Sequence, residues 1–200
     1  PAFEGFERVG ERLREMAPGW TVPDLLGWVR PRPGQLAWVH QNQQWPLLGH
    51  FVAEELWSAW QQWERARRSR GLSLQVEGVE VDAVHLVGLG EWEPWAQVRI
   101  HGRRAVYEWD LTSQLAQAGA TSPGPFTELW WLRPTGMPAH RAALRCSGCG
   151  GEVAFDHLVC GYCGRGVERR PGPWQVVKVQ VLQEALGASG WGDRAEAGWE

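Results

Sequence analysis

The chain has 200 residues and a formal net charge of −3, with 44% hydrophobic and 22% charged residues. This is a globular composition, which excludes a disordered chain, and the length suits one domain with a small satellite. Only one of the 20 basic residues is a lysine, Lys178, so chemistry that needs a lysine must use it. The sequence has no G-x-x-x-x-G-K-[ST], G-x-S-x-G or H-E-x-x-H motif, which excludes the commonest NTPases, α/β-hydrolases and zinc proteases.

The negative charge is concentrated at the C-terminal end. The segment 183–200 carries a net charge of −3, so residues 1–182 are neutral as a whole. A neutral body lacks the counterion release that drives binding to nucleic acid or anionic lipid, so no nucleic-acid partner is expected. No apolar run is long enough for a transmembrane segment, and the N-terminus is unlike a signal peptide. These features predict a cytoplasmic protein.

The first third of the chain predicts helices. Apolar residues at spacings of three and four predict a helix over about 3–17. Residues 23–29 can form a short helix, which the Pro-Arg-Pro-Gly sequence at 31–34 is expected to end. A longer helix is predicted over about 47–68, and one of its faces would carry Leu48, Val52, Leu56, Ala59 and Trp63.

From residue 72 the apolar pattern changes to alternation, which is typical of strands. A turn is expected at 102–104, a loop rich in Ser, Ala, Gly and Pro at 112–125, and a mobile acidic tail at 187–200. Because helices precede an antiparallel sheet, the predicted fold class is α+β. The predicted strands are 72–87, 95–100, 105–109, 126–133 and 174–182.

The cysteines carry the strongest signal. All four lie within 18 residues as two C-x-x-C-G motifs, formed by Cys146 and Cys149 and by Cys160 and Cys163. Each motif is expected to fold into a knuckle whose backbone N–H groups point at sulfur, and two facing knuckles present four sulfurs tetrahedrally. We therefore predict one structural Zn²⁺ in a closed site, with no coordination position left for a substrate.

Other interpretations of the cysteines stay open at this stage. Two disulfides fit poorly in a chain without a secretion signal, and a redox C-x-x-C is not normally doubled. Iron in a rubredoxin-like site is the main alternative metal. His157 lies between the motifs, but four cysteines suffice as ligands, so we interpret it as a flanking histidine.

The elements together resemble a known family. The pattern consists of a long helix with an Arg-rich end at 65–71, strands carrying YEWD at 107–110 and FTELWWLR at 126–133, the double knuckle, and a Trp-led strand at 174–179. Over about residues 3–182 the chain is similar to bacterial relatives of the mitochondrial inner-membrane translocase subunit 44-like domain, which such a ribbon often follows.

The resemblance implies a fold and a role. The fold would be a cone-like curved antiparallel sheet wrapped by N-terminal helices, of the nuclear transport factor two type, around an apolar cavity. It would comprise residues 1–140 with the returning strand 174–182, and a zinc ribbon would occupy 141–170. The family role is protein tethering at the inner membrane, or lipid contact there, without established catalysis, so a protein partner is expected and an apolar ligand or lipid is an alternative.

Four further residues are candidates for ligand or partner binding. Glu55 falls within the apolar face of the long predicted helix, either as a cavity acid or as a rim residue paired with an arginine. Trp57 lies on the opposite side of that helix, where it either packs under a neighbour or is exposed as a partner anchor. Trp130 and Trp131 must point to opposite faces of their strand.

Three functions are compatible with these features. The first is a non-catalytic binding or scaffold module. The second is a cavity isomerase or hydrolase that uses Glu55 with Asp110 or His85, which requires a buried acid within hydrogen-bond reach of a second polar group. The third is nucleic-acid binding through the ribbon, which requires an arginine face free of acids.

Overall fold

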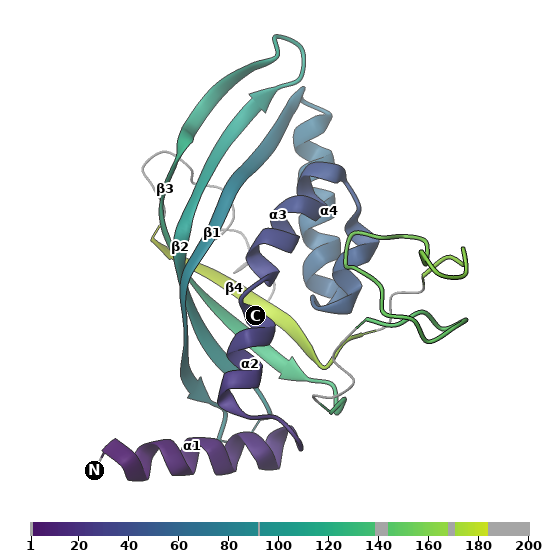
Figure 1. The fold of residues 1–200 in the computed structure, drawn as a ribbon. Helices are drawn as coiled ribbons and strands as arrows, with labels where there is room; N and C mark the ends of the chain where they lie inside the picture. The colour runs from purple at the N-terminus through teal and green to yellow at the C-terminus, as the bar shows by residue number, and fades with distance from the viewer. Residues whose placement is uncertain (1, 92, 139–143, 168–170, 184–200) are drawn as a thin grey trace.

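The structure of the protein, a computed structural model, describes residues 2–91, 93–138, 144–167 and 171–183, with side chains from Arg8 onward. Within these residues, helices precede a four-stranded antiparallel sheet of order β1-β2-β3-β4, which confirms the α+β prediction. The sheet is strongly curved, and α3 and α4 lie against one face of it (Figure 1). In chain order the elements are α1 (Ala2–Met16), α2 (Val22–Val29), α3 (Arg32–Asn42), the 3₁₀ helix η1 (Trp45–His50), α4 (Glu54–Arg68), β1 (Leu72–Leu89), β2 (Ala96–Asp110), β3 (Leu115–Pro134) and β4 (Trp174–Gln183).

Below, "the body" means α1 to β3 together with β4, and "the ribbon" means residues 144–167, which lie between β3 and β4 in the chain. The ribbon extends from one side of the molecule (Figure 1). The predicted boundaries at 140–141 and 170 and the predicted tail at 187–200 lie outside the described residues.

The first two helices match their predictions. α1 lies across one end of the sheet (Figure 1), and Leu13 on its inner side is fully buried. α2 begins at Thr21, whose hydroxyl accepts a hydrogen bond from the Asp24 N–H at 3.3 Å, while the Asp24 carboxylate accepts one from the Thr21 N–H at 3.1 Å. This reciprocal pair satisfies two of the N–H groups that a helix start leaves open.

The short helix ends before residues 31–34 as expected, but the same residues also begin a helix that the sequence analysis does not predict. Pro31 is the N-cap of α3, and Pro33 lies in its first turn, where the N–H that proline lacks has no helical partner in any case. Arg32 is buried, with its guanidinium 4.5 Å from the ring centre of Trp28. The two prolines therefore start a helix rather than prevent one.

The long helix starts later than predicted. α4 begins at Glu54, whereas Leu48 lies in η1 and Val52 forms an isolated parallel bridge with Val176 of β4. Leu48 and Val52 are buried, as their apolar character demands, but not on a common helical face. The apolar spacing continued across this boundary, so it gave no sign of the bridge.

Two expected interruptions of the sheet are absent. β2 continues through Gly102, Arg103 and Arg104 instead of forming a turn there. The glycine is required by the neighbouring strand, because a Cβ at residue 102 would be 2.1 Å from the Glu80 carbonyl oxygen. Most of the expected loop at 112–125 belongs to β3, which begins at Leu115. Small residues tolerate this pairing, since Gly119 adopts φ +97° beside the Val106 carbonyl.

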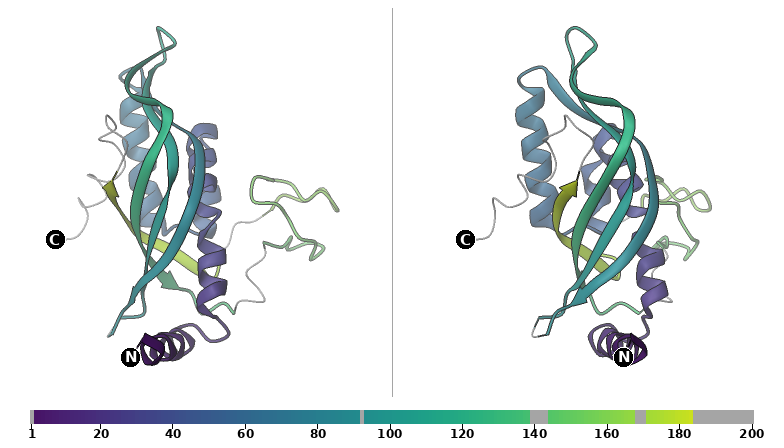
Figure 2. Two further views of the ribbon diagram at one scale, coloured as in Figure 1. Left: turned by 60° about the vertical axis from the view of Figure 1, so that its left-hand side comes forward. Right: turned by 90° about the vertical axis from the view of Figure 1, so that its left-hand side faces the viewer.

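The core lies between the helices and one face of the sheet. Alternate residues of β2 and β3 face it, and the fully buried side chains include Trp20, Trp130 and Trp174. In the right-hand view of Figure 2, α3 and α4 lie behind the sheet and α1 lies across its lower end, and none of the described helices covers the face toward the viewer. In the part of the chain that the structure describes, no helix has the length and apolarity needed to cross a membrane.

Candidate metal centre and ligand groove

The two cysteine motifs fold into the same local structure. In each, the N–H of the residue four positions after the first cysteine donates to that cysteine's carbonyl oxygen at 2.9 Å, from Gly150 to Cys146 and from Gly164 to Cys160. Both glycines have positive φ, 73° and 69°, which a residue with a side chain rarely adopts. The sequence repeat thus corresponds to a repeat of two knuckles, as predicted.

The knuckles bring all four sulfurs together. Every pair of Sγ atoms among Cys146, Cys149, Cys160 and Cys163 lies within 4.8 Å. The Cys146–Cys163 and Cys149–Cys160 sulfurs are 3.6 Å apart. A disulfide requires about 2.05 Å, whereas a tetrahedral ion with bonds of about 2.3 Å to sulfur separates its ligands by about 3.8 Å. The cluster therefore fits a metal ion better than a pair of disulfides.

Backbone N–H groups prepare the first cysteine of each knuckle for a metal. N–H groups of Cys149 and Gly148 lower the pKa of the Cys146 thiol to about 7. N–H groups of Cys163 and Tyr162 likewise lower the pKa of Cys160. Because metal ligation requires the thiolate, these N–H groups favour ligation by Cys146 and Cys160. At Cys149 the Gly151 N–H also lowers the pKa, but the neighbouring thiols outweigh it and raise the pKa to about 11. His157 is exposed and is not among the clustered ligand atoms.

The ribbon is attached to the body at two places. Phe155 packs edge-on against Phe51 with ring centres 5.5 Å apart. Past the ribbon, the Gly172 N–H donates to the His50 carbonyl oxygen at 2.7 Å, and a Cβ at this glycine would lie 2.6 Å from the same oxygen. The last residue of η1 and the residue after it thus contact the chain that leaves the ribbon and the ribbon itself.

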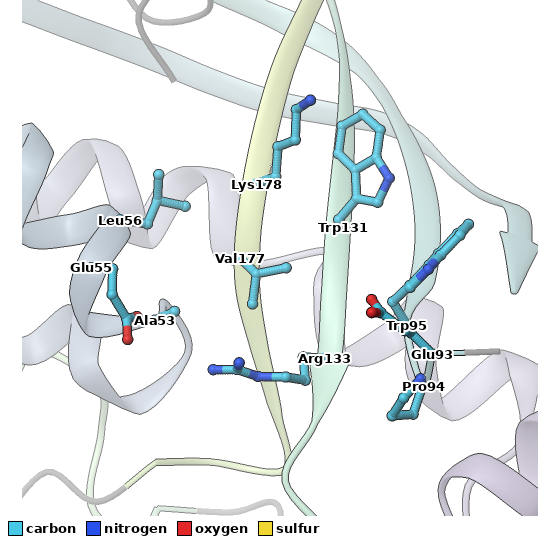
Figure 3. A pocket seen from close by; sticks show the side chains of 10 residues that line it. All are labelled: Ala53, Glu55, Leu56, Glu93, Pro94, Trp95, Trp131, Arg133, Val177 and Lys178. Carbon is cyan, nitrogen blue, oxygen red and sulfur yellow. The ribbon is translucent and has the colours of Figure 1, made fainter. Parts of the chain in front are cut away.

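A groove of about 710 Å³ lies along β4, between the start of α4 and the β1–β2 connection (Figure 3). This volume is typical of sites that bind small molecules or peptide side chains. Its apolar surface comes from Trp95, Trp131, Val177 and neighbouring side chains, and its charged groups are Glu55, Glu93, Arg133 and Lys178.

Both walls of the groove are well fixed. Trp95 ends a tight turn in which its carbonyl oxygen accepts a hydrogen bond from the Gly90 N–H at 2.8 Å, and its ring lies over Gly90. Arg12 of α1 donates to the Glu91 carbonyl oxygen at 2.8 Å and so holds this turn. On the other side, the Ala53 N–H donates to the Val176 carbonyl oxygen at 2.9 Å.

The tryptophan pair divides as predicted. Trp130 is fully buried, and its indole N–H donates to Glu128 at 2.8 Å. Trp131 faces outward into the groove, with the Lys178 ammonium 4.9 Å from its ring centre. Trp57 is half-buried and packs against the core, so the packing alternative describes it.

Glu55 contradicts the cavity-acid interpretation. It is exposed at the rim of the groove rather than buried on an apolar face, because α4 starts only one residue before it. Asp110 pairs with Leu72, beyond the far end of α4, and is therefore about 20 Å from Glu55 along the helix axis. His85 is also exposed. The three residues do not form the site that the cavity-enzyme hypothesis requires.

A buried ionic network surrounds Glu64 and is not predicted by the sequence analysis. Its carboxylate is 0% exposed, 3.4 Å from His40 and 3.1 Å from Arg68, and it accepts a hydrogen bond from Ser73 at 2.9 Å. Burial acts to raise the pKa of Glu64, but interactions with His40, Ser73 and the Leu74 N–H lower it below its ordinary value. The spacing of Glu64 to its arginines is equally typical of an exposed helix face.

A second buried ion pair lies on the core face of the sheet. Arg104 of β2 contacts Glu128 of β3 at 2.7 Å, and both side chains are buried. The Arg104 guanidinium also lies 4.4 Å from the ring centre of Phe126. Because the buried carboxylates of Glu64 and Glu128 each have cationic partners within the protein, we assign the network and this pair to the fold rather than to a site.

Comparisons with protein-family models and with curated proteins find no match for this chain.

Proposed function

We propose that the protein is a non-catalytic binding module whose body binds a protein partner in the groove along β4. The observation that carries this proposal is the groove itself, in which Trp95 and Trp131 lie beside charged side chains that have no ion-pair partner among the described residues. Aromatic side chains that are held in place lose little conformational entropy on binding, and they dominate the energetics of many interfaces.

The resemblance to the translocase subunit 44-like family supports the same role. Helices that precede a strongly curved antiparallel sheet agree with the nuclear transport factor two type of fold that the family implies (Figure 2). The family role would make the protein a tether peripheral to the inner membrane. An apolar ligand or lipid in the same groove is the alternative occupant.

For the ribbon we propose one structural zinc ion. Four thiolates form a soft tetrahedral donor set, and together they would complete the coordination shell, so the ion would organise the ribbon rather than bind substrate. Metal analysis should find one equivalent of zinc per chain. One equivalent of iron, with its visible absorption, would identify the metal as iron instead of zinc. Well under one equivalent of either metal, with free thiols, would contradict a metal site.

Affinity purification with native mass spectrometry tests the binding function. The wild-type chain is compared with Trp131→Ala and with Trp109→Ala, a control at a half-buried tryptophan outside the groove. Trp109 is far from the groove. Gln97 of β2 pairs with Trp131, and Trp109 lies twelve residues further along β2, which is about 40 Å along the strand. We expect a stoichiometric partner that the wild type and Trp109→Ala retain and Trp131→Ala loses. Equal recovery with all three chains would refute the groove as the binding surface.

A further inference from the structure

The groove holds four charged side chains that form no ion pair with another residue in the described part of the chain, although Lys178 contacts the Trp131 ring. None of Glu55, Glu93, Arg133 and Lys178 makes an ion pair within 4.0 Å with another described residue. Elsewhere in the body, the buried carboxylates of Glu64 and Glu128 are each paired. The groove charges are therefore available to a bound molecule.

The two signs of charge occupy different parts of the groove. Arg133 and Lys178 project from the sheet that forms its floor, on the two sides of Val177 (Figure 3). Glu55 comes from the first turn of α4 and Glu93 from the β1–β2 connection, so the two acids lie on opposite rims. A negative group is attracted to the floor and repelled by both rims, which confines it to the centre.

The backbone of β4 explains why the floor has this composition. The register between β3 and β4 shifts at Val177: Lys178 pairs with Trp131, whereas Val176 pairs with Leu132. A bulge of this kind changes where the side chains of the bulged strand point. It allows Val177 and Lys178, which are adjacent in sequence, to line the same groove.

Apolar surface adjoins the cationic floor directly. Trp131 and Arg133 are two residues apart on β3 and so share its outward face, about 7 Å from each other. Trp95 and Pro94 extend the apolar surface on one side, and Leu56 does so on the other. Lys178 is the direct pairing partner of Trp131, so a ligand that fits must place an apolar group next to its negative group.

The same arrangement argues against a long polyanion. A nucleic acid or an acidic stretch would carry further negative charges past Glu55 or Glu93, where each is repelled. One carboxylate flanked by neutral or basic groups avoids this repulsion. An extended peptide with a single acidic side chain has that pattern.

We propose that the groove binds an extended segment of a partner protein, and that this segment carries one Asp or Glu next to a large apolar side chain. This proposal rests on the proposed function and specifies its partner chemistry. The carboxylate pairs with Lys178 on the floor, and the apolar side chain contacts Trp131, Trp95 and Val177. Lys178, the only lysine of the chain, changes from its contact with the Trp131 ring to an ion pair with the peptide.

Selection from a random heptapeptide display library tests this without knowledge of the partner. The library is selected on the full wild-type chain after depletion on the Trp131→Ala chain. The selected peptides are expected to carry one Asp or Glu next to Phe, Trp, Leu or Ile. For the best peptide, anisotropy is measured against wild type, Lys178→Gln and Arg99→Gln, the last removing an exposed cation on β2 outside the groove.

Replacing the peptide's acid by its amide should weaken binding to the wild type about tenfold, and Lys178→Gln should weaken the acidic peptide similarly. The amide peptide should bind Lys178→Gln and wild type equally, and Arg99→Gln should bind like wild type at constant ionic strength. Peptides whose binding depends on Trp131 but not on the acid would overturn this inference and leave the proposed function intact. If no peptide distinguishes wild type from Trp131→Ala, the proposed function itself fails.

A further arm separates a peptide from a free acid. Phenylacetate presents the same carboxylate and apolar group without a peptide chain. We expect it to compete at least a hundredfold more weakly than the selected peptide, because it lacks the backbone and flanking contacts. Competition as strong as that of the peptide would show that the groove selects a small aromatic acid, and the peptide assignment would be wrong.

Discussion

The body buries an extended apolar core that includes Trp20, Trp130 and Trp174, whereas the buried cluster of the ribbon consists of Cys146, Val153 and Cys160. Units as short as the ribbon cannot bury enough surface to remain folded and generally need a metal or disulfides. The body depends on packing between residues distant in sequence, and the ribbon depends on ligands that are close in sequence. The two regions should therefore respond differently to the same perturbation.

Loss of the metal should have the largest effect and should separate the two regions. In Cys160→Ser, or after chelation, we expect the ribbon to unfold because the free energy of metal binding, about 10 kcal/mol or more, is its folding free energy. Hydrogen exchange should show lost protection of amides in residues 146–167, with β1 to β3 still protected. Ser147→Ala, an exposed change between two ligands, is the control. Global unfolding on chelation would show that the body depends on the ribbon.

Glu64→Gln should destabilise the body and leave the ribbon unaffected. The change leaves Arg67, Arg68 and His40 without their buried carboxylate, and breaking one side of such a network costs about 3–5 kcal/mol. Urea unfolding measures the loss, with Glu54→Gln at an exposed position of the same helix as control. Metal content should stay at one equivalent, and a variant with an unchanged urea midpoint would contradict the structural role of Glu64.

Phe155→Ala tests the contact between the regions. Removing this ring should weaken the contact between ribbon and body by about 2 kcal/mol, which is less than the loss of a fully buried phenylalanine because the Phe155 ring is only half-buried. The ribbon itself should stay folded, because its metal ligands are unchanged. Exchange of the Gly172 and Val176 amides should accelerate, whereas the Gly150 and Gly164 amides should be unchanged. Loss of metal from this variant would mean that the body stabilises the ribbon.

Asp110→Asn should give the smallest effect, confined to the β2–β3 turn. Hydrogen bonds from the Ser113 and Thr112 N–H groups lower the pKa of Asp110, so its charge stabilises the fold above the unfolded-state value of about 3.9. That contribution is lost as the pH falls through the lower folded-state pKa. The variant should be slightly less stable than wild type at pH 7 and equally stable in strong acid. A difference that persisted in acid would indicate a steric rather than an ionic effect.

Local patterns were predicted best. The ribbon follows from the five-residue C-x-x-C-G motif, which occurs twice, and β1 and β4 follow from their alternating apolar residues. α3 was missed because prolines were interpreted as breakers, although they are favourable in a first turn. The length of β2 and β3 was missed because Gly102 and Gly119 are required by neighbouring chains, not by their own segment.

The groove could not be predicted for a related reason. Trp95, Trp131 and Lys178 come from three segments, and only the register of the sheet brings them together. Trp131 was identified as a candidate from strand alternation, which is local information. Glu55 was identified too, but the start of α4 depends on the bridge between Val52 and Val176, which no local pattern shows.

The hydrogen bonds that join Thr135, just after β3, to Gly172 and Pro173, just before β4, have a topological consequence. The Thr135 N–H donates to the Pro173 carbonyl oxygen at 2.9 Å, and its hydroxyl donates to Gly172 at 2.6 Å, so the insertion enters and leaves the sheet at one point. β4 can pair with β3 only if the ends of the connection at Thr135 and Gly172 come together during folding. A metal that cross-links the four cysteines shortens the length of unfolded chain between these ends. Halving that length lowers the closure cost by about 0.6 kcal/mol. A short hairpin turn in place of residues 136–171 would lower this cost further, so we expect the sheet to close without the ribbon.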